Sequence, residues 1–463
     1  MRSARALALS LLAALAACGP RPESSRPQVD SLVEPLLRDG WTTAMVIGIS
    51  RPQGDTVYGY GTIGPGGAVP GAHTIFEIGS VTKTFTGLAL ATMVEDGSVS
   101  LSTPVQDLIG PDPVIPTFDG QSITLQHLAT HTSGLPRLPD NLDPVDPADP
   151  YADFDAAALD SFLAGYSLPA APGTSYLYSN LGMGLLGRAL ALHAATDYAG
   201  LLQARVTGPL GMGDTATSLT AEQSSRLVRG HDGDLAAVPP WTWNVLAGAG
   251  ALRSTASDLL RFVAAQSGAE PSPLASAMAL SQVPRFRIDA ATQTGLAWII
   301  DDGGLVWHNG STAGNESFVG FDPRTHTGIV VLSDTTSGFQ PASQLGLALL
   351  SWVAGRGLGT VSLPVLATLP TAVLERDVGA YRFIDPDTAQ PAELVVALSG
   401  GLLRASIGGG APVGLYPVDE TGFIARAPEV PAAVRFHIGP GNLADSLVFQ
   451  FEGAPAVTAT RVP

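Results

Sequence analysis

Lysine, cysteine and basic charge are all scarce in this chain of 463 residues. Of its 24 Lys and Arg residues, only Lys83 is a lysine, so arginine serves at every other basic position. The one cysteine, Cys18, has no partner for a disulfide within the chain, which leaves packing to stabilise the fold. Asp and Glu number 41 and set the net charge at -17. This balance argues against nucleic acid as a partner, because phosphate binding needs basic surface.

Apolar runs long enough to span a membrane are also missing. Arg2 and Arg5 precede an apolar run, Ala6 to Ala17, that is too short for a transmembrane helix. The run ends in Leu-Ala-Ala-Cys and resembles the lipobox of bacterial lipoproteins. The resemblance implies a signal peptide over residues 1–18 with Cys18 lipidated, hence an exported protein held to the cell-envelope membrane by its lipid, facing the periplasm or the cell exterior. A plain secretory signal is the alternative.

The pattern of apolar residues divides the rest of the chain into two parts. Alternation over 43–63 predicts a β-hairpin, and helical spacing over 80–95 predicts a helix. Strand-like runs return over 295–300, 304–308, 318–322 and 327–332, before a helix over 341–353. A sheet built from early and late segments around a helical insert is an α/β arrangement with two lobes. Short strand-like runs separated by Gly turns, over 394–398, 402–407, 434–438, 447–451 and 457–462, predict a small all-β barrel or sandwich. The predicted parts are a tether over 19–30, a domain over 31–355, a linker over 356–372 and the β domain over 373–463.

The segment FEIGSVTKTFTG, Phe76 to Gly87, places Ser80 and Lys83 three residues apart. On a helix that begins near Ser80 the two side chains share a face, so the amine lies beside the hydroxyl. Serine is a weak nucleophile until a base removes its proton, and a buried lysine with a lowered pKa can be that base. Arginine cannot replace it, because its guanidinium stays protonated. The survival of a single lysine here therefore indicates a nucleophilic serine rather than a helix cap followed by a solvated lysine.

Four further segments follow in the order in which one enzyme superfamily carries them. They are ITLQHLATHTSGLP (Ile123–Pro136), PGTSYLYSNLGMGLLG with Tyr178-Ser179-Asn180, AGALRSTASDLLRF (Ala249–Phe262) and WHNGSTAG (Trp307–Gly314) with His308-Asn309-Gly310. With the Ser-x-x-Lys element they resemble the serine β-lactamase and penicillin-binding-protein superfamily, in particular class C β-lactamases, D-alanyl-D-alanine carboxypeptidases and related esterases. The resemblance covers residues 31–355 and implies an antiparallel sheet flanked by helices plus a helical lobe. The β domain resembles the lipocalin-like tail of some members.

The resemblance also implies a role for each matching residue. Ser80 is the nucleophile that forms an acyl-enzyme, and Lys83 helps to deprotonate it. Tyr178 is the general base and later donates a proton to the leaving group, although its ordinary pKa near 10 requires help from Lys83. Asn180 orients Lys83 or binds the substrate amide. The oxyanion hole consists of the backbone N–H groups of Ser80 and of Ser311.

The last segment departs from the β-lactamase pattern. His308, two residues before Gly310, stands where a class C β-lactamase has lysine. A neutral histidine attracts the carboxylate of a β-lactam less, so the departure favours the carboxypeptidase, aminopeptidase and esterase branches. The implied substrates are small molecules or peptides: a peptidoglycan stem peptide or other D-amino-acid peptide, a β-lactam, or an ester. The alternative of a different class is a catalytically silent lipoprotein that holds peptidoglycan stems or a partner.

Other residue patterns carry weaker signals. His127 and His131 have the spacing of a zinc pair, but position 128 is leucine rather than glutamate, so we expect no metal site and prefer a structural role. No cofactor is implied. Trp241 and Trp243 suit a substrate cleft and a packing role equally well. No Gly-x-Ser-x-Gly elbow exists, so an α/β-hydrolase lipase is unsupported.

Overall fold

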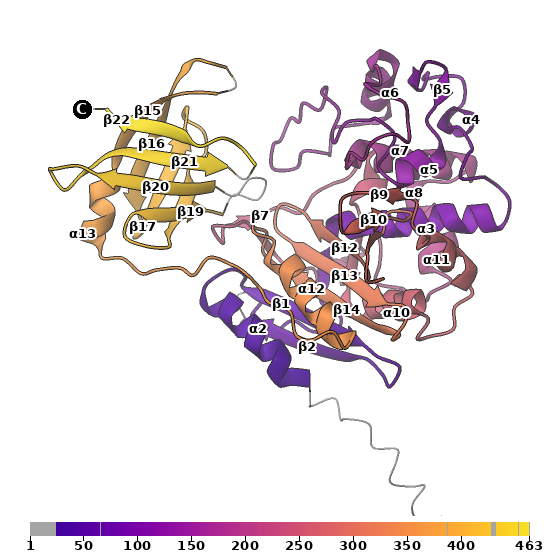
Figure 1. Ribbon diagram of the computed structural model, residues 1–463. Helices are drawn as coiled ribbons and strands as arrows, with labels where there is room; N and C mark the ends of the chain where they lie inside the picture. Colours follow the sequence, from indigo (N-terminus) through magenta and orange to yellow (C-terminus); the bar gives the residue numbers. More distant parts are fainter. Residues whose placement is uncertain (1–24, 65, 387, 427–431, 452, 463) are drawn as a thin grey trace, which may run out of the picture.

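The computed structural model describes residues 25–462 apart from 65, 387, 427–431 and 452. Figure 1 shows a larger α/β domain beside a smaller barrel, joined by an extended connection. The predicted signal peptide and Cys18 lie outside the described residues. Within the described part of the chain, no helix combines the length and the apolar character needed to cross a membrane.

An eight-stranded antiparallel sheet forms the centre of the larger domain, in the order β2-β1-β14-β13-β12-β11-β10-β9. The predicted N-terminal hairpin supplies β1 and β2 and is confirmed. The other six strands come from the end of the domain, so distant parts of the chain meet in one sheet. The strands are β1 (Ala44–Ser50), β2 (Thr56–Gly61), β9 (Phe286–Arg287), β10 (Thr292–Thr294), β11 (Ile299–Asp301), β12 (Val306–Ser311), β13 (Glu316–Asp322) and β14 (Thr327–Ser333).

Helices cover both faces of the central strands, which explains why β1, β13 and β14 are buried along their whole length. Successive strand residues point to opposite faces. Met45 packs toward α2 (Arg26–Arg38) and α12 (Pro341–Val353), whereas Val46 packs toward the other layer. That second layer contains α3 (Thr82–Glu95), α10 (Ala256–Ser267) and α11 (Ala275–Ser281), as Figure 1 shows.

The helical lobe is inserted between the two strands of a small sheet, β3 (Ile75–Glu77) and β8 (Arg253–Thr255). Its longest helix, α7, is buried along most of its length and contacts α3, α4 and α5. The lobe therefore packs on the helix that follows the predicted nucleophile. Its helices are α4 (Val105–Ile109), α5 (Leu125–Ala129), α6 (Ala156–Gly165), α7 (Asn180–His193), α8 (Tyr198–Leu202) and α9 (Ala221–Ser224), with short hairpins β4 (Thr117–Phe118) with β5 (Gln121–Ser122) and β6 (Gly230–His231) with β7 (Ala237–Val238).

Two local predictions need correction. The predicted tether over 19–30 is too long, because α2 already begins at Arg26, where Pro27 occupies the first turn and Val29 is buried against the sheet. The strand expected over 295–300 is wrong in its first part. Residues 295–298 form a turn in which the Gly295 N–H donates to the Trp298 carbonyl (2.8 Å). These residues are apolar because they are buried against the helical layer, not because they pair in a sheet.

The C-terminal part is a closed eight-stranded antiparallel barrel, which resolves the choice between barrel and sandwich. Alternate side chains from its strands, among them Tyr381, Phe423 and Phe436, fill the interior. A stretch without regular structure leads from the larger domain to α13 (Thr371–Leu374). The barrel strands are β15 (Gly379–Ile384), β16 (Pro391–Ser399), β17 (Leu402–Ile407), β18 (Val413–Pro417), β19 (Gly422–Ala425), β20 (Ala432–Ile438), β21 (Ala444–Phe451) and β22 (Val457–Arg461).

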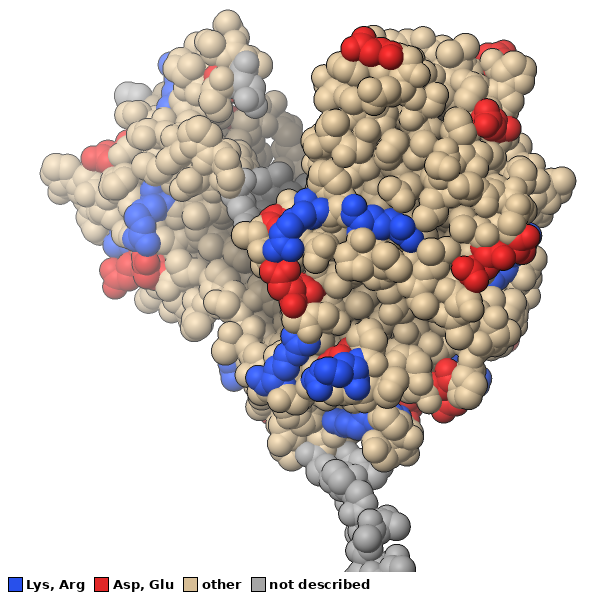
Figure 2. Space-filling view, turned by 45° about the vertical axis from the view of Figure 1, so that its right-hand side comes forward, with Lys and Arg blue, Asp and Glu red and all other residues tan. Residues whose placement is uncertain are grey.

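The barrel contacts the larger domain through the β6–β7 hairpin and through the segment around Trp41. Asp234 at its tip accepts hydrogen bonds from Arg404 (2.8 Å), the Gly414 N–H (2.9 Å) and the Tyr416 hydroxyl (3.1 Å). The Arg426 guanidinium stacks over both Tyr416 and the ring of Trp41. Beside this contact the two domains leave a hollow of about 670 Å³. Figure 2 shows such a recess between the two bodies and charged side chains scattered over the surface.

Candidate active site

A tight turn places Ser80 against the end of β12. The chain leaves β3, makes a 3₁₀ turn over Gly79–Val81 and enters α3. Gly79 has φ of +46°, a conformation that L side chains rarely adopt, and a Cβ added there would lie 2.7 Å from the Ser311 nitrogen. Glycine is therefore required for the close approach of the two backbones. The helix begins two residues later than Ser80, but the turn keeps Ser80 and Lys83 on one side.

Lys83 is fully buried, and its amine donates to two oxygens. The Nζ atom lies 2.8 Å from Ser80 Oγ and 2.7 Å from the Ala249 carbonyl oxygen. Burial, assisted by the positive charge of Arg137, holds the pKa of Lys83 well below its ordinary value. A neutral amine in hydrogen-bond contact with a serine hydroxyl can accept the proton of that hydroxyl.

Tyr178 stands directly before α7, whose N-terminus is capped by the Ser179 side chain. Its ring lies 4.9 Å from Lys83 Nζ and is 4.5 Å from the His131 ring, centroid to centroid. Burial raises the pKa of Tyr178, while a hydrogen bond with Ser80 and the charge of Arg137 oppose that rise. Tyr178 is therefore protonated at neutral pH, which favours its expected role as proton donor to the leaving group over its expected role as general base.

Two histidines flank Tyr178, and both are neutral. Burial and the neighbouring charge of Lys83 lower the pKa of His308 to about 3. Its Nδ1 lies 2.5 Å from the Asn309 carbonyl oxygen, which can only accept, so Nδ1 carries the proton and Nε2 has a free lone pair. Burial likewise lowers the pKa of His131, whose Nδ1 accepts the Ser179 N–H (3.1 Å). His308 therefore offers an acceptor rather than a positive charge.

The backbone of β12 lies against the nucleophile turn. A Cβ added to Gly310 would lie 2.9 Å from the Ser80 nitrogen and 2.1 Å from the Ile78 carbonyl oxygen. Gly310 thus lets the strand approach closely enough for Ser311, the next residue, to sit beside Ser80. This is the arrangement in which two backbone N–H groups can bind one oxyanion.

Comparison with known protein families agrees with the arrangement of residues around Ser80. A family model described as Beta-lactamase covers residues 29–351. The chain belongs to the Beta-lactamase family. Its residues 29–351 include every side chain brought together around Ser80.

Named members of the family include peptidases and β-lactamases. The chain is 31% identical over 243 residues to the D-alanyl-D-alanine-carboxypeptidase/endopeptidase AmpH of Escherichia coli (strain K12), covering 52% of this chain and 62% of that relative. It is 28% identical over 282 residues to a β-lactamase of Pseudomonas fluorescens, covering 59% and 74%. The solved D-alanine carboxypeptidase AmpC from Burkholderia cenocepacia superimposes with a TM-score of 0.61 at 25% identity, over 71% of this chain and 98% of that one.

The match spans less than two thirds of the length of the Escherichia coli relative. These relatives support a serine hydrolase of the β-lactamase family and give no support to the catalytically silent alternative.

Asn180 is the predicted site residue whose contacts differ from expectation. It lies at the first position of α7, but the second hydrogen-bond partner of Lys83 is the carbonyl of Ala249 rather than Asn180. The buried Oδ1 of Asn180 has no hydrogen-bond partner among the described residues. Of its two implied roles, the structure therefore favours binding of a substrate amide.

Three residues that contribute to the site were given no role by the sequence patterns: Ala249, Arg137 and Glu77. Glu77 is a buried carboxylate that accepts hydrogen bonds from the Trp241 N–H (2.9 Å) and the Thr312 hydroxyl (3.0 Å), and pairs with Arg253 (3.3 Å). It thereby ties together the segments on either side of Ser80. Its position within FEIGS, three residues before the serine, was the signal available. Ala249 acts through its carbonyl, for which no side-chain signal exists.

The remaining candidate residues have packing roles. His127 Nδ1 accepts the Thr124 N–H in a capping box at the start of α5. Trp241 and Trp243 form an aromatic cluster with Tyr151, with the Tyr151 and Trp243 rings stacked at 4.3 Å. No group of three or more possible metal ligands occurs in the part of the chain that the structure describes.

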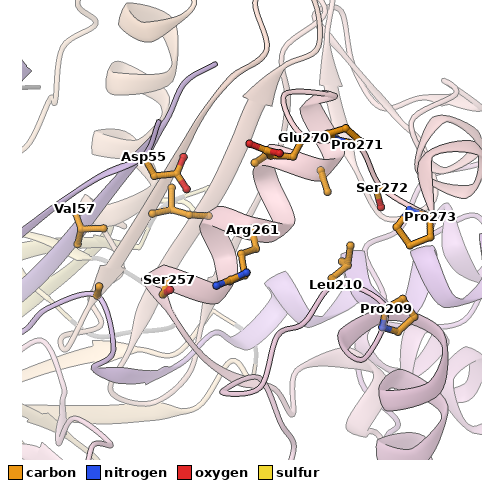
Figure 3. A pocket seen from close by; sticks show the side chains of 14 residues that line it. Asp55, Val57, Pro209, Leu210, Ser257, Arg261, Glu270, Pro271, Ser272 and Pro273 are labelled. Atoms are coloured by element: carbon orange, nitrogen blue, oxygen red, sulfur yellow. The ribbon is translucent and has the colours of Figure 1, made fainter. Parts of the chain in front are cut away.

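A hollow of about 460 Å³ lies elsewhere on the domain, between the β1–β2 turn and α10. Figure 3 shows Asp55, Arg261 and Glu270 around it, with Ser257 and Ser272 at its wall. Burial and the charge of Glu270 raise the pKa of Asp55. No lysine or histidine lines this hollow to activate its serines. The Ser80 cluster is therefore the better candidate for chemistry.

Proposed function

We propose that the protein is a serine hydrolase that acts through an acyl-enzyme on Ser80. It cleaves amide or ester bonds, and its substrates are D-amino-acid peptides, β-lactams or small esters. The observation that carries the proposal is the 2.8 Å contact between the Ser80 hydroxyl and the buried amine of Lys83. Burial lowers the pKa of that amine well below its ordinary value, which favours the neutral form that can accept a proton.

The acylation step follows from the protonation states. Lys83 takes the proton of Ser80 as Oγ attacks the substrate carbonyl, and the resulting oxyanion is bound by the N–H groups of Ser80 and Ser311. Tyr178 then donates its proton to the leaving amine or alkoxide. The proton on Lys83 passes to the tyrosinate and restores both groups. In deacylation a water molecule replaces the leaving group, and the same pair accepts its proton.

The test is intact-protein mass spectrometry of the chain without residues 1–18. Samples are taken over minutes after addition of a penicillin, with disappearance of the penicillin and of p-nitrophenyl acetate followed in parallel. We expect either a lasting adduct or turnover, each lost in Ser80→Ala. A lasting adduct places the protein with penicillin-binding peptidases, and turnover without an adduct with β-lactamases. The proposal is contradicted if a folded protein shows no adduct and no turnover with any β-lactam, ester or D-peptide.

We further propose that the protein is an exported lipoprotein anchored at Cys18. The support is the sequence Leu-Ala-Ala-Cys after an apolar run, in a chain with no other cysteine. Expression of the full chain in a bacterial host with radiolabelled palmitate is expected to label the wild type and not Cys18→Ala. Equal labelling of both chains, or recovery of both in the soluble fraction, contradicts lipidation at this residue.

A further inference from the structure

The residues around Ser80 that the sequence motifs identify carry little positive charge. Lys83 has a lowered pKa, and His308 and His131 are both neutral. Because Nδ1 of His308 carries the proton, its Nε2 can only accept a hydrogen bond. A substrate carboxylate is therefore not attracted by the residue in the position where a class C β-lactamase has lysine.

Arg137 supplies the missing charge. Its carbonyl accepts the N–H groups of Asn180 (3.0 Å) and Leu181 (3.2 Å), so its backbone is fixed to the start of α7 beside Tyr178. Its guanidinium carbon lies 5.3 Å from the centre of the Tyr178 ring. The same ring lies 4.9 Å from Lys83 Nζ, which places the guanidinium at the rim of the catalytic cluster.

The Arg137 side chain is exposed and unpaired. Arg253, by contrast, is paired with the buried Glu77, and Arg188 with Asp160. Among the described residues no carboxylate lies within ion-pair distance of Arg137, and no side-chain hydrogen bond engages its guanidinium. A guanidinium keeps its charge at any accessible pH and presents two parallel N–H donors that match a carboxylate.

We propose that Arg137 is a specificity-determining residue that binds a carboxylate of the substrate. The inference rests on the proposed function and names its substrate class: molecules with a free carboxylate beside the scissile bond, as at the C-terminus of a D-peptide. A role confined to stacking on Tyr178 predicts instead that loss of Arg137 affects charged and neutral ligands alike.

The test measures binding without turnover. In the Ser80→Ala chain, isothermal titration calorimetry at low salt compares N-acetyl-D-alanyl-D-alanine with its C-terminal amide. We expect the carboxylate to bind up to about fivefold tighter than the amide, since an exposed charge pair contributes modestly. Arg137→Gln in the same background is expected to abolish that preference and Arg137→Lys to restore part of it. Arg287→Gln, which removes a guanidinium from an exposed surface pair with Asp302, serves as the matched control and should leave the preference intact.

Equal binding of the two ligands, or a preference that survives Arg137→Gln, overturns the inference. An equal loss of affinity for both ligands in Arg137→Gln shows the stacking role and also overturns it. These outcomes are separate from the acyl-enzyme test. An adduct on Ser80 without a carboxylate preference removes only this inference, whereas a preference that depends on Arg137 without any adduct removes only the catalytic proposal.

Discussion

Replacement of Lys83 by arginine is expected to lower kcat by on the order of 10³–10⁴, because arginine cannot act as a base at accessible pH. The lysine amine lies between Ser80 Oγ and the Ala249 carbonyl in a fully buried position, and burial lowers its pKa well below the ordinary value. Arginine cannot release a proton there, and its larger charged group has no buried partner. Steady-state hydrolysis of the best substrate from the panel measures the effect.

The matched control is Lys83→Met, which removes the amine without adding a charge. We expect an equally inactive but better folded protein, so thermal denaturation separates lost chemistry from lost stability. Because the chain has a single lysine, labelling with ¹³C-lysine gives one side-chain signal whose titration reports the pKa directly. Activity should rise with pH as that amine loses its proton. Titration near the ordinary value of 10.5, or an active Lys83→Arg chain, would rule out Lys83 as the base.

The local parts of this site could be read from the sequence, because they depend on spacing. Ser80 and Lys83 are neighbours along one turn, and the structure places their side chains in contact. The hairpin over 43–63 and the helix over 341–353 were likewise set by local periodicity and are confirmed. By contrast, the pairing of β1 with β14, in which Met45 lies opposite Ser333, joins segments that share no local signal.

The missed features depend on tertiary contacts or on weak local patterns. The neutral state of His308 follows from its burial and from the carbonyl of Asn309, neither of which a motif reveals. Strands β15, β18 and β19 were missed, and in β18 and β19 the residues Gly414, Pro417 and Gly422 lower the strand propensity of the segments. The turn over 295–298 was misassigned because burial and strand pairing select the same apolar residues. The sequence thus identified the catalytic residues, whereas the charge state of the site follows only from the folded structure.

Gly310→Ala is expected to reduce kcat by at least about 10³ through backbone displacement alone. The added methyl would lie 2.1 Å from the Ile78 carbonyl oxygen and 2.6 Å from Ser317 Oγ. That carbonyl already accepts the Ser317 hydroxyl and the Val81 N–H, so it cannot shift without disturbing the turn that holds Ser80. Strand β12 must move instead, which separates the N–H of Ser311 from that of Ser80. Loss of one oxyanion donor costs about 10²–10³, and a misplaced nucleophile adds to it.

Gly213→Ala is the control, because a Cβ at Gly213 meets nothing within 4 Å and should leave kcat and the melting temperature unchanged. For Gly310→Ala we expect a lower melting temperature with the fold retained, and a loss in kcat larger than the loss in substrate affinity. This split identifies a defect in the transition state, since the oxyanion forms only after attack. A Gly310→Ala chain with wild-type kcat would show that β12 can withdraw without loss of the oxyanion hole, and would remove Ser311 from it.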